Sequence, residues 1–461
     1  MSFLVKVPFL TTAVPTWSDL FTQEVYDDYN NIFNDETNYT NKVYIDPDYT
    51  GGDSDGTIEK PFLTIRDAPL SQNDTAYLVK RGTYHIYGFE HISYDNCNIN
   101  GSNVMLGAYG EGDPPHLDST NRHLNFRGPN FLVRDVKIAS LVLGQYNNPT
   151  AKNGIVFNTD IRAVTVWSLN HKFIGCHFGP AGRNSFFCQM VGDVLAEGPN
   201  YIEVGYSLFE KANQVWLPDG KPETEASGDA FMLSNYAGTW HIHHSILDRS
   251  DTGNKFCIIV NPHTNGDRPV NGIIENCYLE GPRMHPDGGA CILLGNIVVN
   301  NGSATNRHEI IIRNNIIQGT YCDIANTWTG AGIYANSAYM EVYGNIIKKT
   351  NYAARTGSSQ SIVYNNTFVD MKNTNASILS LNTAKLYNNI FDRQHHASGT
   401  DSANNIYLDQ IGTEPDDVFI NPATEDYRLK ANGPAVGASI WESWMDSDWT
   451  QDLLGNNIPQ S

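Results

Sequence analysis

Acidic, basic and imidazole side chains gather in one short stretch, residues 227–259, which reads SGDAFMLSNYAGTWHIHHSILDRSDTGNKFCII. On a strand, the side chains of His241 and His243 would point to one face and that of His244 to the other. Carboxylates, imidazoles and lysine amines are the side chains that transfer protons in enzymes. We therefore expect one active site here, with the candidate catalytic residues Asp229, His241, His243, Asp248, Asp251 and Lys255.

Glycoside hydrolysis is the first chemistry that fits this stretch. It needs two carboxyl groups that flank the scissile bond, one as acid and one as base or nucleophile. Asp229 paired with Asp251 or Asp248 would supply them. The alternative is structural, because Asp and Gly in the run 248–254 are also typical of a tight turn and a carboxylate at a strand entry also caps backbone amides.

β-Elimination is the second chemistry that fits. A base removes the proton α to a uronate carboxylate while a cation neutralises that carboxylate. Lys255 would be the base, since burial beside another cation would lower its pKa. Arg249, Arg268 or Arg283 would be the neutralising cation. The residue types alone leave the choice between the two reactions open.

Three long insertions flank the same stretch, at residues 210–229, 261–272 and 281–289. Long loops on a rigid scaffold are where binding residues concentrate. Aromatic side chains suit the apolar faces of sugar rings, although packing within the loops is the alternative for the two tryptophans. The candidate substrate-binding residues are Trp216, Glu225, Arg249, His263, Arg268, Arg283, His285 and Trp328.

A repeated apolar phrase indicates the scaffold that must position these residues. An apolar residue comes first, small or polar residues follow, and an apolar pair closes the phrase. The copies are VRDVKI (133–138), FIGCHF (173–178), VGYSLF (204–209), IHHSIL (242–247), IENCYL (274–279), IRNNII (312–317), VYGNII (342–347), VYNNTF (363–368) and LYNNIF (386–391). Their spacing of 21 to 40 residues suits stacked coils of which some carry loop insertions.

A second strand precedes several of these phrases, for example GDAFMLS (228–234) and GACILLG (289–295). Two or three short β-branched strands per repeat, without a helical period, predict an all-β fold. Because one coil cannot bury its own apolar face, the coils must stack. The sequence therefore predicts a single right-handed parallel β-helix, a solenoid with loop insertions and a short non-solenoid N-terminal segment.

Aligned asparagines support this prediction. In stacked coils the same position recurs directly above itself, and stacked amides hydrogen-bond along the axis. One column would contain Asn315, Asn345, Asn366 and Asn389, continued by Ser207, Ser245 and Cys277. A second would contain Asn314, Asn365 and Asn388, beside Asn276, His244 and Tyr206. We interpret both columns as structural and expect the chemistry where asparagine is replaced, in the IHHSILDRSD coil.

The two ends of the repeat region carry a resemblance to a known family. The opening phrase VYIDPDYTGGDSDGTIEKPFLTI (43–65) and the closing phrase DYRLKANGPAVGAS (426–439), followed by DLLGN (452–456), resemble the pectate-lyase-like superfamily of β-helices. The resemblance covers roughly residues 42–461. We expect three parts: an N-terminal segment at 1–41, the β-helix at 42–425 and a closing segment at 426–461.

Residues 1–41 are aromatic and acidic and show no coil pattern. Such a segment ahead of a carbohydrate-active β-helix resembles bacteriophage tailspikes, in which it docks on the virion. The alternative is a cap over the first coil, which open solenoid ends require. The phrase MSFLVKVPFLTTAVPTWSDL lacks the pattern of a signal peptide, so we expect synthesis in the cytoplasm without one.

The resemblance implies a tailspike-type enzyme that binds and depolymerises a bacterial surface polysaccharide. It would be a virion tail protein that acts outside the cell, with other tail proteins and a homotrimer as its assembly partners. The alternatives are a cellular polysaccharide lyase or epimerase of the same fold, and a virion adhesin that binds without catalysis. DLLGN is common in secreted bacterial members and favours the cellular alternative.

Composition excludes other classes of protein. Lys and Arg total 30 against 50 Asp and Glu, and a net charge of −20 argues against a nucleic-acid partner. No apolar run is long enough to span a membrane. The seven cysteines form no CxxC pair, so we expect buried free thiols and no metal site. We expect no cofactor; calcium at GDSDG (52–56) is the weak alternative.

Overall fold

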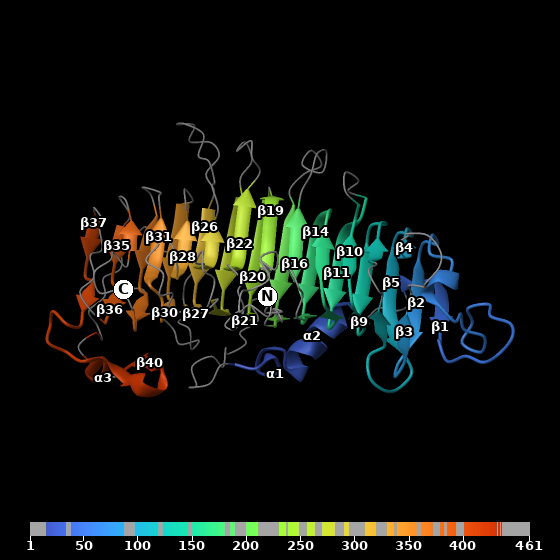
Figure 1. Ribbon diagram of the computed structural model, residues 1–461, viewed down its shortest axis with the longest axis horizontal. Helices are drawn as coiled ribbons and strands as arrows, with labels where there is room; N and C mark the ends of the chain where they lie inside the picture. Colours follow the sequence, from blue (N-terminus) through green and yellow to red (C-terminus); the bar gives the residue numbers. More distant parts are fainter. Residues whose placement is uncertain are drawn as a thin grey trace, which may run out of the picture.

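The computed structural model of the chain describes residues 15–33, 38–86, 97–118, 123–145, 150–179, 185–189, 200–210, 230–236, 238–248, 256–262, 270–281, 290–294, 309–319, 330–335, 339–356, 361–371, 379–381, 385–392, 401–430, 432–433 and 435. These residues wind into a right-handed parallel β-helix whose coils stack along one long axis (Figure 1). The predicted fold class is confirmed. Three parallel sheets, here named A, B and C, run the length of the solenoid, and each coil contributes one short strand to a sheet.

Sheet A consists of β1 (Asn41–Ile45), β2 (Thr75–Lys80), β5 (Val104–Tyr109), β8 (Phe131–Arg134), β11 (Lys152–Phe157), β14 (Leu169–Ile174), β17 (Tyr201–Gly205), β20 (Gly238–His243), β23 (Val270–Glu275), β26 (Glu309–Arg313), β29 (Tyr339–Tyr343), β32 (Ile362–Tyr364), β35 (Lys385–Tyr387) and β37 (Asp401–Ala403).

Sheet B consists of β3 (Tyr84–Ile86), β6 (His116–Asp118), β9 (Lys137–Ile138), β12 (Asp160–Ile161), β15 (His177–Phe178), β18 (Leu208–Phe209), β21 (Ile246–Asp248), β24 (Tyr278–Glu280), β27 (Ile316–Gln318), β30 (Ile346–Lys348), β33 (Thr367–Val369), β36 (Ile390–Phe391) and β38 (Ile406–Tyr407).

Sheet C consists of β4 (Cys97–Ile99), β7 (Leu124–Phe126), β10 (Leu141–Leu143), β13 (Val164–Val166), β16 (Phe186–Gln189), β19 (Phe231–Tyr236), β22 (Phe256–Pro262), β25 (Ala290–Leu294), β28 (Ala331–Ala335), β31 (Tyr352–Thr356) and β34 (Leu379–Leu381).

The repeated phrases span the turn from sheet A to sheet B, and the predicted ladder lies inside that turn. The backbone N–H of Asn345 donates to Asn366 Oδ1 at 3.0 Å, and that of Asn366 donates to Asn389 Oδ1 at 3.0 Å. Ser207 continues the ladder, because its Oγ accepts from the N–H of Cys176 at 3.1 Å. The prediction that these residues register the coils is confirmed.

The second column has a backbone cause as well. Its residues adopt a left-handed backbone, with φ of 53° at Asn276, 53° at Asn365 and 55° at Asn388. Asparagine and glycine tolerate this conformation better than other residues, which explains their recurrence. Tyr206 and His244 occupy the same position, with φ of 52° and 46°.

One coil of the β-helix lacks the usual form of the repeated phrase. The 40-residue gap between the first two copies contains one further coil, formed by β11 and β12. Its phrase is VFNTDI (156–161), which ends on a polar residue and one isoleucine instead of an apolar pair. The gap is therefore two ordinary coils rather than one coil with a long insertion.

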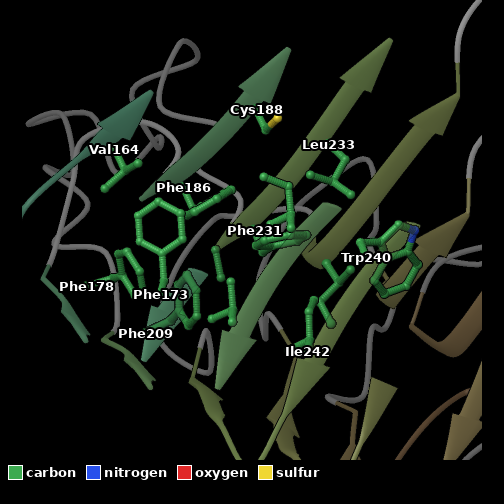
Figure 2. Packing of buried hydrophobic residues seen from close by; sticks show 14 of the residues in the cluster. Val164, Phe173, Phe178, Phe186, Cys188, Phe209, Phe231, Leu233, Trp240 and Ile242 are labelled. Atoms are coloured by element: carbon green, nitrogen blue, oxygen red, sulfur yellow. The ribbon is translucent and has the colours of Figure 1, made fainter. Parts of the chain in front are cut away.

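Aromatic rings stack along the interior. Phe178 and Phe209 lie 4.3 Å apart between ring centroids, and Phe186 and Phe231 lie 4.7 Å apart, each pair nearly parallel. Figure 2 shows these rings with Trp240, Cys188 and neighbouring aliphatic side chains in the same cluster. Six cysteines are buried free thiols, as predicted: Cys97, Cys176, Cys188, Cys257, Cys277 and Cys291. Cys322 lies outside the described residues.

The N-terminal segment packs on the side of the solenoid. Helices α1 (Trp17–Leu20) and α2 (Gln23–Phe33) lie against its middle coils (Figure 1). Val25 packs on the outer face of sheet A, and Leu20 packs on the outer face of sheet B. Arg134 fixes α2 by donating to Asn30 Oδ1 at 2.7 Å. Docking of residues 1–41 to a virion stays a prediction.

A short C-terminal unit covers the last coils of sheet B. It contains α3 (Pro415–Val418) and the antiparallel hairpin of β39 (Phe419–Asn421) and β40 (Asp426–Leu429). Val418 and Phe419 pack with Val369 and Ile390 of sheet B. Within the part of the chain that is described, no helix is long and apolar enough to cross a membrane.

Candidate active site on the outer face of sheet A

Sheet A alternates between an apolar inner face and a polar outer face in its middle coils. Val204, Ile242 and Ile274 point into the core and are almost completely buried. The residues between them point outward in two rows that run across the strands. Lys172, Glu203 and His241 are register partners in one row. Gly205, His243, Glu275, Arg313 and Tyr343 are register partners in the other.

The first group of interactions surrounds Glu203 on β17. Lys172 Nζ lies 2.7 Å from Oε2 of Glu203, and the Tyr201 hydroxyl donates to the same oxygen at 3.1 Å. The other oxygen, Oε1, faces Nε2 of His243 at 3.4 Å. Burial opposes ionisation of Glu203, but hydrogen bonds from His243 and Lys172 outweigh it and lower its pKa to about 2.

The second group surrounds Glu275 on β23. His241 Nε2 lies 2.8 Å from Oε1, and Arg313 Nε donates to Oε2 at 2.7 Å. Arg313 also donates to the Tyr343 hydroxyl at 3.1 Å. Burial again opposes ionisation, but the hydrogen bond from His241 and the charge of Arg313 outweigh it and lower the pKa of Glu275 to about 2.

The two groups meet at the histidines. The ring centroids of His241 and His243 are 4.5 Å apart. The imidazole of His243 lies over Gly205, where an added Cβ would come within 2.3 Å of the ring. Glycine at this position is therefore what lets the side chain of His243 reach Glu203. Burial lowers the pKa of His243, against the opposing pull of Glu203, so its ring is neutral near pH 7.

Each carboxylate fixes the proton position of one imidazole. Ionised Glu275 only accepts hydrogen bonds, so Nε2 of His241 carries the hydrogen and Nδ1 has the lone pair. The side chain of His241 is 25 % exposed, so solvent and ligands reach it. Among the described residues no hydrogen-bond partner faces Nδ1 of His241. A partly exposed imidazole oriented by a carboxylate is the arrangement of a general base.

Three of the predicted catalytic residues lie within the described residues, and they fall on two sheets. His241 and His243 point outward from β20 of sheet A. Asp248 points outward at the end of β21 in sheet B, where its register partner is Glu280. The structure thus brings the two histidines together and places Asp248 on the face of another sheet. Asp229, Asp251 and Lys255 lie outside the described residues.

All of the predicted substrate-binding residues lie outside the described residues: Trp216, Glu225, Arg249, His263, Arg268, Arg283, His285 and Trp328. Their roles stay predictions. The described parts of the chain contain no group of three or more His, Cys, Asp or Glu side chains that could hold a metal ion.

The sequence reasoning missed Glu203, Glu275 and Arg313. A signal for two of them was present, because the second letter of each repeated phrase marks one outward row of sheet A. Read in order from VGYSLF, these letters are Gly205, His243, Glu275, Arg313 and Tyr343. Two basic side chains and one acidic side chain occupy this same position in three successive coils. Charged residues at one repeated position indicate a polar outer face of the sheet.

Comparison with known proteins gives distant likenesses of fold. No protein-family model and no curated protein matches the chain. Among solved structures, the GH136 lacto-N-biosidase from Eubacterium ramulus matches with a TM-score of 0.40 and 11% identity, over 80% of this chain and 67% of that one. The pectate lyase Pel9A matches with a TM-score of 0.33 and 11% identity, over 90% of this chain and 96% of that one. Likenesses at this level assign no activity to the chain.

Proposed function

We propose that this chain binds and cleaves a polysaccharide on the outer face of sheet A, with His241 as the catalytic base. One observation carries the proposal: His241 lies partly exposed on a sheet face and is hydrogen-bonded to ionised Glu275 at 2.8 Å. A carboxylate that sets the tautomer and orientation of an imidazole makes the other ring nitrogen a base near neutral pH.

The charge state of the cluster favours β-elimination over hydrolysis. Hydrolysis needs a protonated carboxyl group as general acid. Glu203 and Glu275 both have pKa values lowered to about 2, so neither carries a proton at neutral pH. Elimination needs only a neutral base and a cation near the substrate carboxylate. The side chain of Lys172 is 46% exposed and is the cation of this cluster that a uronate carboxylate reaches most easily.

Nδ1 of His241 takes the proton α to the uronate carboxylate, and the electron pair of that C–H bond forms a carbon–carbon double bond. The bond between the linkage oxygen and the carbon β to the carboxylate breaks, and its electron pair leaves with the oxygen, which takes a proton from solvent. The products are a new reducing end and an unsaturated uronate. Glu275 and Arg313 orient the imidazole without bonding to the substrate.

The test incubates the purified full-length chain with uronate-containing and neutral bacterial surface polysaccharides. Ultraviolet absorbance from unsaturated products and reducing ends are followed together. We expect both to rise on a uronate-containing polymer, and both to fall at least about a hundredfold in His241→Gln. His116→Gln, on sheet B, is the matched control and should keep wild-type activity.

Other outcomes have defined meanings. New reducing ends without ultraviolet absorbance would show that the chain cleaves by hydrolysis and not by elimination. An altered sugar configuration without new ends would indicate an epimerase. Binding to a polymer without any product, by wild type, would overturn the enzymatic proposal in favour of a non-catalytic adhesin.

Our narrower proposal is that the protein is a bacteriophage tailspike-type depolymerase that acts on its host's surface polysaccharide. The non-solenoid N-terminal helices ahead of the β-helix support it. Immunogold labelling of virions from a lysate that contains the chain would place label at the tail. Label confined to the bacterial cell or the culture medium would favour a cellular lyase instead.

A further inference from the structure

Two residues break the pattern of the left-handed position at the turn from sheet A to sheet B. Asparagine, aspartate or glycine occupies this position with positive φ in other described coils: Asp135, Asn158, Gly175, Asn276, Asn314, Gly344, Asn365, Asn388 and Asn404. Tyr206 and His244 adopt the same conformation, with φ of 52° and 46°. Tyrosine rarely adopts it, histidine does so more often, and strained positions of this kind cluster at functional sites.

These exceptions occur in the two coils that hold Glu203 and the two outward histidines, and their rings touch. Tyr206 and His244 are stacked, with centroids 4.8 Å apart and planes within 15°. His244 Nδ1 lies 3.1 Å from His243 Nδ1. Asparagine at either position would remove a ring of this stack.

Helices α1 and α2 support the stack from outside the solenoid. The edge of the Tyr29 ring packs on Tyr206 at 5.8 Å between centroids. The indole N–H of Trp17 donates to the backbone oxygen of Tyr206 at 3.0 Å. The left-handed conformation of Tyr206 is thus held by contacts that come from the N-terminal segment.

We propose that Tyr206 and His244 are positioning residues: His244, held by the ring of Tyr206, completes with Glu203 the pair of contacts that fixes the tautomer of His243 and, through its ring, the placement of the base His241. This proposal rests on the proposed function for its catalytic consequence, but its effect on His243 stands without it. Since ionised Glu203 accepts from Nε2–H of His243, Nδ1 of His243 must accept, and His244 Nδ1–H is the donor that faces it. Burial lowers the pKa of His244 to about 3, so His244 donates as a neutral ring.

The test replaces each aromatic residue by the residue that other coils use. His244→Asn and Tyr206→Asn relieve the strained backbone, so neither should lower the urea midpoint of unfolding. Both should lower kcat by about tenfold to a hundredfold, the size of effect that a small misplacement of a reacting group produces. KM should stay within about twofold, because the substrate contacts remain. Asn365→His is the matched control, which should lower the midpoint and leave kcat unchanged.

A second readout does not depend on activity. Imidazole nitrogen chemical shifts from NMR report the tautomer of His243. In wild type we expect hydrogen on Nε2, and in His244→Asn a mixture of tautomers. Unchanged shifts together with unchanged kcat in both variants would overturn the proposal. If the wild-type protein shows no activity but His243 has the expected nitrogen chemical shifts, the proposed function is wrong and the positioning role of Tyr206 and His244 stands.

Discussion

Replacing Asn366 in the ladder should destabilise the fold strongly, and the structure gives the size of the effect. Asn366 is buried, and its Oδ1 accepts from the backbone N–H and from Nδ2 of Asn345, each at 3.0 Å. Its Nδ2 donates to Val342 O and Tyr364 O at 2.9 Å and to Asn389 Oδ1 at 3.0 Å. Alanine removes all of these bonds.

Each buried polar group left without a partner costs about 1–3 kcal/mol. The backbone N–H of Asn345 loses its acceptor in Asn366→Ala, and at least one amide donor bond is lost with it. We therefore expect Asn366→Ala to lower the free energy of unfolding by about 3–5 kcal/mol. Serine should cost less, about 1–2 kcal/mol, because it keeps one acceptor and one donor. Ser207 shows both: its Oγ accepts from the N–H of Cys176 at 3.1 Å and donates to Gly205 O at 2.8 Å.

Urea unfolding of wild type, Asn366→Ser and Asn366→Ala measures the order of stabilities. Hydrogen exchange of the Asn345 amide, followed by mass spectrometry of the peptide that contains it, measures the local effect. Exchange should quicken strongly in the alanine variant and modestly in the serine variant. If the alanine variant is as stable as the serine variant and the Asn345 amide stays protected, the ladder does not hold the coils as described.

The pKa of Glu203 in the folded protein is lowered to about 2. Its ionised form therefore stabilises the fold above about pH 4.3, and this stability is lost as the pH falls toward 2. In Glu203→Gln the urea midpoint of unfolding should depend less on pH over that range. Glu425→Gln removes the carboxylate that pairs with Lys348, and because Glu425 is partly exposed we expect a loss of about 1 kcal/mol in the free energy of unfolding. Limited proteolysis should therefore cut the β39–β40 hairpin faster than in wild type. Phe209→Ala removes a buried ring stacked on Phe178 at 4.3 Å and should cost about 3–5 kcal/mol by urea unfolding, whereas Phe209→Leu should cost about 1 kcal/mol.

The solenoid was predictable because its signals are local and recur. Each coil must bury the same apolar positions and satisfy the same turn, so Asn315, Asn345, Asn366 and Asn389 return at the same place in the repeated phrase. The coil at VFNTDI was missed because its phrase lacks the closing apolar pair. A template taken from the clearest copies overlooks a coil whose core position is filled differently.

The candidate site was predictable only in part. The alternation of His241 and His243 to one face followed from strand geometry, and it holds in the structure. Their partners come from neighbouring coils, about 30–40 residues away along the chain, and such contacts leave no local pattern. Asp248 seemed close to the histidines in sequence, but the chain turns from sheet A to sheet B between them. The position of α2 beside Tyr206 likewise depends on tertiary contacts.

The central claim is that the chemistry takes place at the histidine and glutamate cluster of sheet A rather than at Asp248 on sheet B. Turnover of a uronate-containing bacterial polysaccharide by His241→Gln and by Asp248→Asn, measured side by side with wild type, tests it most directly. We predict at least about a hundredfold loss of kcat in His241→Gln and less than about threefold loss in Asp248→Asn. Full activity in His241→Gln with loss in Asp248→Asn would contradict the claim.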